Sequence, residues 1–436
     1  HFTYQRLLHF CLPSIVMMIF PSIYGVVDGL FVSNFVGQIP FAAIFLVMPF
    51  IMILGGFGFM IGTGGSALIA KTLGEGRHEL ANRYFSMLII MTVILGFFLT
   101  TIGIVFARRV SILLGATDVM LDDCVIYLRT VLLFISPFML QNVFQSFFVT
   151  AEKPHLGLYV VIAAGVTNMV LDFLFVGILG FGLAGAALAT VCGEFIGGLF
   201  PIFYFTRKNS SLLRLGKTQW NGHVLLQTCI NGSSELMTNL SSSIMNSLYN
   251  IQLMKFAGEN GVAAYGTMMY INFIFLAIFF GYSIGSAPVI SYHYGAGNQD
   301  ELKNLFKKCL RLIGTWGIML ALLSPLLAAP LSKLFVGYDA ELFAMTEHGF
   351  RIYCLAYLIN GFNIFGSSFF TALNNGVISA AISFLRTLVF QIIMILLLPT
   401  LLGINGIWSA VGIAELMTLC VTITFFIKQR EKYHYV

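Results

Sequence analysis

The sequence predicts an all-α membrane protein of twelve transmembrane helices, arranged as two pseudo-symmetric lobes of six. Three observations predict this fold. Hydrophobic residues make up 58% of the 436 residues and charged residues only 9%, whereas soluble domains carry roughly 25% charged residues. Apolar runs of about 20 residues, the length that spans a bilayer, recur through the chain. A motif of the first half also recurs in the second half.

Breaking the apolar runs at clusters of charged residues, glycine and proline gives twelve expected helices. The first run has no small-residue cleavage pattern after it and is too long for the apolar region of a signal peptide, so we expect a retained helix. The expected helices are 9–36, 42–71, 84–107, 124–150, 156–179, 182–206, 224–257, 262–292, 305–330, 345–371, 377–401 and 405–428.

The two halves repeat each other at an offset of about 221 residues. Gly74-Glu-Gly76 returns as Gly295-Ala-Gly297, and Glu194 returns as Glu415. We therefore expect an N-lobe in residues 1–205, a cytoplasmic linker in 206–223 and a C-lobe in 224–436. Because six is an even number, both lobes enter the membrane in the same orientation, as parallel repeats related by an axis along the membrane normal. Such folds favour alternating access, with substrate bound between the lobes.

Basic residues predict the orientation, since cytoplasmic loops carry an excess of Lys and Arg. With both termini inside, 16 of the 23 basic residues fall in cytoplasmic segments. Three others, Arg129, Arg351 and Arg386, are expected near helix ends, from which long side chains reach the interface. We expect a multi-pass protein of the inner (plasma) membrane with cytoplasmic termini. Its net charge of +5 is then explained by topology, so no nucleic-acid partner is expected.

Cysteine and histidine carry no recognisable chemistry here. The seven cysteines have no C-x-x-C spacing, so they indicate neither a disulfide framework nor a zinc site. No H-E-x-x-H pattern is present, which argues against a membrane metalloprotease. A membrane-embedded enzyme would need a nucleophile with a positioned base, and no histidine lies deep enough in an expected helix. We therefore expect no enzyme and no cofactor apart from a coupling ion.

Asp28 lies inside the apolar stretch from Cys11 to Val36, where an ionisable residue is costly and usually functional. Asn168 and Asp172 are four residues apart and share one face of the fifth expected helix. A short turn at 180–182 then brings Thr190 of the sixth helix back beside them. Counting from the outer turns at ~1.5 Å per residue places the two aspartates and Thr190 at one depth, roughly 12 Å below the outer surface.

Two carboxylates, an amide and a hydroxyl are hard oxygen donors that suit Na⁺. They also suit a proton, because two neighbouring carboxylates resist double ionisation. The alternative is that each aspartate is separately hydrogen-bonded for packing alone. At an offset of 221, Asp28, Asn168, Asp172 and Thr190 correspond to Tyr249, Val389, Ile393 and Val411. The second lobe lacks the cluster, which favours a coupling site confined to the first lobe.

Two further acids are candidates for an additional polar site. Glu194 lies one turn from Thr190, and its repetition as Glu415 suits a paired structural role as well as a transport role. Glu235, near the start of the seventh helix, is interpreted either as an intramembrane acid or as an interface residue. The 19 Met and 43 Phe residues would suit a cavity for aromatic cations, although most are expected to face lipid.

These motifs together resemble the multidrug and toxic compound extrusion (MATE) family, in its bacterial DinF/MepA-like branch. The resemblance rests on Val27-Asp28-Gly-Leu-Phe-Val-Ser-Asn34-Phe-Val-Gly37, the Gly74-Glu-Gly76 loop, and Asn168-x-x-x-Asp172 followed by Thr190. It implies secondary active efflux of cationic or amphipathic organic compounds, in exchange for inward Na⁺ or H⁺. It also implies that Asp28, Asn168, Asp172 and Thr190 form the site for that ion. Tyr127 matches a neighbouring family position, and Gln145 stands where some relatives carry Asn.

The second lobe departs from the family pattern. Glu235 is similar to an acidic helix-seven position of some relatives, but no buried Asp is expected on the tenth helix. A lipid-linked oligosaccharide flippase with the same lobes stays open as an alternative, although it would need basic residues lining its cavity to hold pyrophosphate. Because both lobes lie within one chain, we expect a monomer in the lipid bilayer.

Overall fold

The computed structural model describes residues 2–436, apart from the side chains of residues 26, 29, 30, 33, 38, 41, 42, 45 and 335. Helices are the regular structure of this part of the chain, and no strand occurs in it. The α-helices are α1 (Tyr4–Phe35), α2 (Gln38–Gly74), α3 (His78–Leu113), α4 (Leu121–Leu133), α5 (Ile135–Thr150), α6 (Pro154–Asp172), α7 (Gly182–Thr206), α8 (Gly222–Gly295), α9 (Gln299–Val336), α10 (Ala340–Tyr353), α11 (Asn360–Ala372), α12 (Gly376–Phe384), α13 (Phe390–Leu402) and α14 (Ile404–Tyr433). Short π or 3₁₀ turns, η1 (Phe173–Ile178), η2 (Cys354–Leu358) and η3 (Leu385–Val389), join some of them.

The expected number of membrane spans is confirmed within residues 2–436. Ten helical segments are long and apolar enough to cross a bilayer, and α4 with α5 forms another span bent by 59°. One of the ten is the 74-residue α8, which is broken at Gly258 and counts as two. Each of the twelve spans overlaps one of the expected helices.

Gly258 turns the chain back within α8. Its backbone (φ 66°, ψ −152°) is a conformation that L side chains rarely adopt. Tyr249 and Tyr265 stack across this point with ring centroids 5.1 Å apart, whereas sixteen residues of continuous helix would separate them by about 24 Å. The seventh and eighth spans are therefore an antiparallel pair, as the expected helices 224–257 and 262–292 imply.

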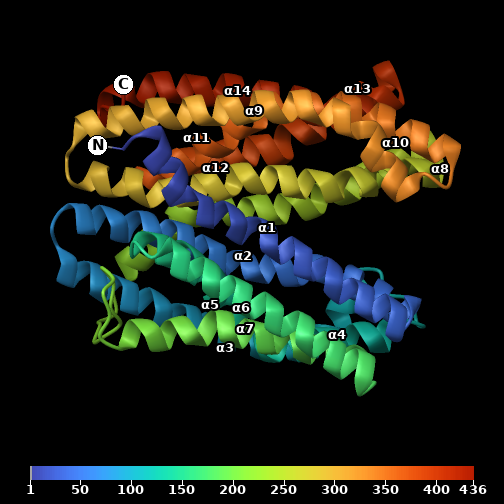
Figure 1. The fold of residues 1–436 in the computed structure, drawn as a ribbon, viewed down its shortest axis with the longest axis horizontal. Coiled ribbons are helices and arrows are strands. Elements are labelled where there is room, and N and C mark those ends of the chain that lie inside the picture. Colours follow the sequence, from blue (N-terminus) through green and yellow to red (C-terminus); the bar gives the residue numbers. More distant parts are fainter. Residues whose placement is uncertain (1) are drawn as a thin grey trace.

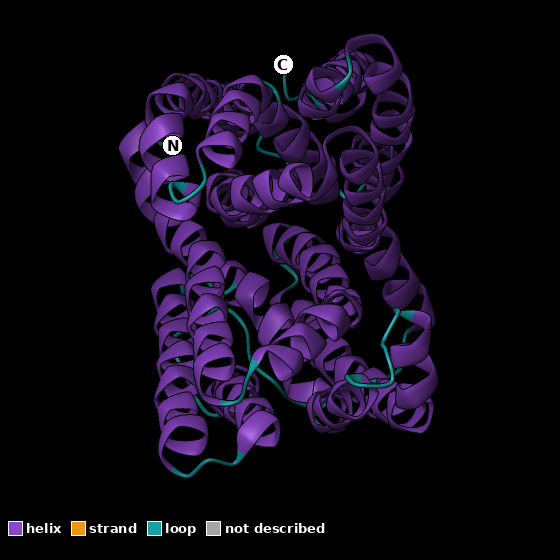
Figure 2. Cartoon of the chain, turned by 90° about the vertical axis from the view of Figure 1, so that its right-hand side faces the viewer, coloured by secondary structure: helices purple, strands orange, loops and turns teal. Residues whose placement is uncertain are grey.

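The helices form two groups, one above the other in Figure 1, and Figure 2 shows both groups end on. The lower group contains α2–α7 and the upper group α8–α14. Both chain termini lie at one end of the molecule, near the loops that follow α2 and α8. This arrangement agrees with an even number of spans and with two lobes in the same orientation.

The first helix of each half begins against the opposite lobe. Leu7, Cys11 and Ile15 of α1 belong to the hydrophobic core of the C-lobe, and the backbone amide of Phe2 donates to Glu301 over 2.9 Å. In the second half, the start of α8 packs on α2, where Gly232 lies against the Met60 backbone. The contacts of the two halves thus cross the sequence boundary at 206–223 in a reciprocal way.

The lobes meet closely at the end that carries the termini. A Cβ atom at Gly74 would overlap the Tyr292 carbonyl oxygen, and one at Gly295 would overlap the Lys71 carbonyl oxygen. These four positions are related by the 221-residue offset, so the two contacts are equivalent under the pseudo-two-fold axis. The hydroxyl of Ser291 also donates to the Ala67 carbonyl oxygen over 2.5 Å. At this end of the molecule the two lobes therefore touch through two equivalent backbone contacts.

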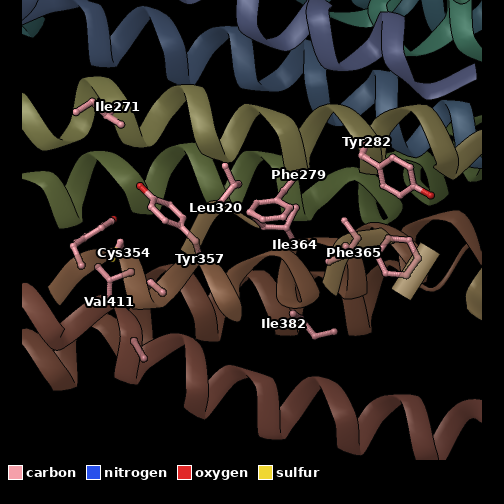
Figure 3. Close-up of a cluster of buried hydrophobic side chains, with 14 of the residues drawn as sticks. Ile271, Phe279, Tyr282, Leu320, Cys354, Tyr357, Ile364, Phe365, Ile382 and Val411 are labelled. Atoms are coloured by element: carbon pink, nitrogen blue, oxygen red, sulfur yellow. The ribbon is translucent and has the colours of Figure 1, made fainter. Parts of the chain in front are cut away.

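Large buried side chains hold each lobe together. In the C-lobe, Phe279, Tyr282, Tyr357, Ile364 and Phe365 pack between α8, α9 and α11 (Figure 3). In the N-lobe, a group of aromatic rings joins α3, α5 and α7 around Phe85, Phe144, Phe147, Phe148 and Phe205. Within a bilayer such rings stabilise a lobe through van der Waals packing, because the lipid tails are as apolar as the rings themselves. These cores fix the helices that carry the polar site.

Candidate functional site

The two predicted aspartates of the first lobe face each other. Asp28 lies on α1 and is 6% exposed, and Asp172 ends α6 and is 0% exposed. Their carboxyl groups lie within hydrogen-bonding reach. The π-turn η1 begins directly after Asp172, and such turns inside α-helices are frequent at functional sites. Helices α1 and α6 pack side by side, so residues 144 positions apart in the sequence meet as predicted.

Several buried oxygens of this cluster have no hydrogen-bond donor. They are one carboxylate oxygen of Asp28, both carboxylate oxygens of Asp172 and the amide oxygen of Asn168. Native proteins leave few buried polar atoms unpaired, and each exception needs an explanation. Two ionised carboxylates cannot bond each other, because both only accept. These unpaired oxygens can therefore bind a proton or coordinate a cation.

Thr190 and Tyr127 lie at the side of this cluster. The Thr190 hydroxyl on α7 donates to the Ala186 carbonyl oxygen over 3.1 Å, and the buried Tyr127 hydroxyl of α4 lies close to it. The Thr190 oxygen keeps lone pairs with which it can accept a bond or contact a cation.

Glu194 joins the same region of the N-lobe. It is buried on α7, one carboxylate oxygen has no partner, and it lies close enough to interact electrostatically with Asp28. Two residues that sequence reasoning missed complete the surroundings. They are Tyr24 and Gln141, whose side chains lie close to each other and, for Tyr24, near Glu194. Tyr24 precedes Asp28 by four residues, so helical spacing was the signal that could have found it.

Gln145 is buried on α5, one turn from Gln141, and its amide oxygen has no hydrogen-bond partner. Its place among the site residues stays a prediction. Within the described part of the chain, no group of three or more His, Cys, Asp or Glu side chains could hold a metal ion. Any ion at Asp28 and Asp172 would therefore rely on amide, hydroxyl or backbone oxygens for its remaining ligands.

We expected Ile393 to be the second-lobe counterpart of Asp172, but the structure shows that the counterpart is the next residue, Met394. Ile393 is 44% exposed, whereas its neighbour Met394 is 7% exposed and belongs to the C-lobe core. The left-handed turn residues Glu152 and Asn374 are 222 positions apart, and both precede these helices. The offset is therefore 222 here, and an apolar Met394 takes the place of Asp172. The conclusion that the second lobe has no equivalent carboxylate cluster is unchanged.

Arg386 corrects another expectation. We expected it near a helix end with its side chain at the interface, but it lies in the π-turn η3 inside the C-lobe, with its side chain 7% exposed. Its guanidinium pairs with Glu415 over 3.1 Å. Asn363 donates to the same carboxylate over 2.7 Å. An arginine this deep is retained because it has a partner acid on α14, which the linear sequence does not reveal.

Glu235 is half-buried on α8, on the side that faces the N-lobe. It lines a cavity of about 30 Å³ between the lobes, together with Arg386. Ser66 and Ser146 reach this interlobe cavity from the N-lobe, and Ser283 reaches it from α8. This position favours the intramembrane interpretation of Glu235, which stays a prediction.

Comparison with known proteins agrees with this architecture. The MatE family model matches residues 13–174 and again 236–397. The chain is 25% identical over 428 residues to the multidrug export protein MepA of Staphylococcus haemolyticus, covering 97% of this chain and 93% of that protein. It is 22% identical to MepA of Staphylococcus aureus, with the same coverage of 97% and 93%.

Solved structures share the fold. A MATE crystallised with MaL6 superimposes with a TM-score of 0.92 at 21% identity, covering 99% of this chain and 97% of that one. A MOP superfamily transporter from Pyrococcus furiosus, described as having a binding pocket of reverse polarity, superimposes with a TM-score of 0.90 at 21% identity, covering 97% and 95%. With twelve spans in two repeated halves, each matched by the same family model, the chain belongs to the MATE family, in its MepA-like branch.

Proposed function

We propose that this protein is a secondary active multidrug efflux transporter of the plasma membrane. It exchanges cationic or amphipathic organic compounds for inward Na⁺ or H⁺, by alternating access of its two lobes. The MepA relatives are named multidrug export proteins, and their match over nearly the whole chain supports the same activity here. Both termini are placed in the cytoplasm by the positive-inside rule, and the protein works as a monomer.

One observation carries the coupling mechanism: Asp28 and Asp172 face each other with carboxylate oxygens that no donor satisfies. A charge in this interior is costly unless it is neutralised. The site therefore favours uptake of a proton or a Na⁺ ion, with Asn168 and the Thr190 hydroxyl as further oxygen donors. Because the ligands come from α1, α6 and α7, ion binding draws these helices together and can bias the first lobe between two conformations.

The flippase alternative finds less support. Pyrophosphate recognition needs unpaired basic groups. Among the described residues that line the interlobe cavity, the basic one is Arg386, and it is already paired with Glu415. An enzymatic role likewise lacks a nucleophile with a neighbouring base in this site. Turnover of a lipid or peptide by the purified protein would favour the enzyme, and the absence of gradient-dependent efflux would favour the flippase.

Efflux of ethidium from proteoliposomes tests the proposal, with a Na⁺ gradient and a pH gradient imposed separately. We expect one gradient to drive efflux by the wild type and Asp172→Asn to abolish that response. Asp118→Asn makes the same chemical change at an exposed position and should leave efflux intact. Transport by neither gradient would overturn the function, and an unimpaired Asp172→Asn protein would overturn the coupling site.

A further inference from the structure

A second hollow lies on the surface of the C-lobe, where the first turn of α1 meets α9. Figure 1 shows the N-terminus beside α9, at the end of the molecule that carries both termini. The hollow is open and has a volume of about 570 Å³. It is lined by Tyr4, Arg311, Leu312, Gly314, Thr315 and Ile318. Arg311 and Ile318 lie seven residues apart, so one face of α9 presents a basic group and then, two turns further, an apolar side chain.

Arg311 lies at the boundary of the hydrocarbon region. The 21 residues 312–332 contain no charged residue, and Lys333 follows them directly. A helix of that length is roughly 31 Å long, which matches a hydrocarbon core of about 30 Å. Lipid phosphates lie just outside this core. Arg311 is therefore level with the lipid headgroups, whereas Ile318, which is 54% exposed, is level with the acyl chains.

Two basic side chains meet at this level. The Arg311 guanidinium donates to the Tyr4 hydroxyl over 3.1 Å, which uses one of its five N–H groups. The Lys308 ammonium donates to the Phe2 carbonyl oxygen over 2.6 Å and lies 5.3 Å from the Tyr4 ring centroid. Neither cation forms an ion pair with a described residue, and the nearby acid Glu301 accepts from the Phe2 amide. Two positive charges thus keep donors for an anion.

The equivalent face of the N-lobe is apolar. With the 221-residue offset, Arg311 corresponds to Ile90 on α3 and Ile318 corresponds to Phe97. Ile90 is 45% exposed and Phe97 is 64% exposed, so this face of α3 offers the lipid only hydrocarbon surface. The duplicated scaffold therefore does not require a basic residue at this depth, and the charge of the α9 face needs its own explanation.

We propose that this hollow binds an anionic phospholipid of the cytoplasmic leaflet. Arg311 binds the phosphate through paired N–H groups and Lys308 contributes a second positive charge, while one acyl chain lies along Leu312 and Ile318. The bound lipid touches α1 and α9 at once, so it holds the start of α1 against the C-lobe. This site goes beyond the efflux function and uses none of the residues of the ion site.

Native mass spectrometry of delipidated protein in detergent tests this site. Dioleoylphosphatidylglycerol is the probe, and dioleoylphosphatidylcholine is the matched lipid, because it has the same chains but no net charge. We expect the wild type to prefer phosphatidylglycerol roughly tenfold or more. Arg311→Gln and Lys308→Gln should each reduce that preference about fivefold, which is the contribution of one basic residue near an anionic membrane surface.

Lys428→Gln is the control variant, because it removes the same charge from an exposed position near the end of α14. It should keep the preference of the wild type. Gel filtration and thermal unfolding without added lipid check that each variant is folded. Should Arg311→Gln fail this check, Lys308→Gln decides the outcome.

Three results would overturn the site. They are equal affinity of the wild type for the two lipids, an unchanged preference in the folded variants of Arg311 and Lys308, and an equal loss in Lys428→Gln. Competition with glycerol phosphate separates a lipid from a free phosphate. We expect no displacement of the lipid, and full displacement would overturn the proposal in favour of a soluble anion. Because binding is measured without a gradient, its failure is distinguishable from failure of efflux.

Discussion

Glu194 and Glu415 occupy equivalent positions in the two lobes, yet their surroundings differ in charge. Glu415 accepts from Arg386 and Asn363, whereas Glu194 has an unpaired oxygen and lies near Asp28. With the 222-residue offset of these helices, the position equivalent to Arg386 is Ala164, whose carbonyl oxygen lies beside Gly193. One lobe pairs its buried acid with an arginine, and the other has an alanine at the position equivalent to that arginine, so its acids have no such partner there.

This difference indicates how one duplicated scaffold serves two purposes. A fixed ion pair stabilises one arrangement of helices, because breaking it leaves an uncompensated buried charge. An acid cluster without a fixed cationic partner can bind and release a proton or a metal cation, so its charge can respond to an ion gradient. We therefore expect the C-lobe network to be structural and the N-lobe cluster to couple transport to the ion.

The variant with the largest expected loss of stability is Arg386→Gln. It leaves Glu415 buried without its cation and should cost about 3–5 kcal/mol, seen as a large loss of thermal stability in detergent. Adding Glu415→Gln to the same protein should restore most of the stability. A single variant as stable as wild type would show that the pair is not structural.

Asn363→Ala should have the next largest effect, since it removes a donor to the Glu415 carboxylate. We expect about 1.5–3 kcal/mol, the value of a hydrogen bond to a charged group. Asn142→Ala is the matched control, because its amide donates to the neutral Gly55 carbonyl oxygen over 3.1 Å and should cost only about 1 kcal/mol. Thermal unfolding followed by tryptophan fluorescence compares the two, and equal losses would contradict a special role for Glu415.

The glycine turns that follow α2 and α8 have the same backbone conformation in the two lobes. Gly76 and Gly297 have φ values of +83° and +70°, and no atom lies near the position of an added Cβ. Alanine at either site should therefore cost only the backbone strain, about 1–2 kcal/mol, and by equal amounts. Thermal unfolding of Gly76→Ala and Gly297→Ala measures this, and a clear inequality would mean that the two loops are not equivalent.

Glu194→Gln should have the smallest effect on stability, about 0.5 kcal/mol or less, because no fixed cation is lost. Glu415→Gln, measured alongside it by thermal unfolding, should be clearly less stable than wild type. A similar destabilisation in both proteins would indicate that Glu194 has a structural partner, and the contrast between the lobes would fail.

The spacing of polar residues within helices was enough to predict part of the site. Asn168 and Asp172 share a helix face, and depth counting brought Asp28 to their level. Tyr24 was missed although it lies one helical turn before Asp28. Gln141 was missed because a glutamine within an apolar helix carries no distinctive pattern. Arg386 was assigned to a helix end because its partner, Glu415, lies 29 residues away on another helix.

The sequence by itself determined the membrane class, the twelve spans and the duplication, because hydropathy, segment length and repetition are properties of the linear chain. Only the tertiary structure decided which buried charges are paired. Pairing depends on which helix faces meet, and a π-turn or a one-residue shift in offset changes the face that a side chain occupies. For that reason Asp28 and Asp172 face each other without a basic partner among the described residues, while Arg386 and Glu415 are paired.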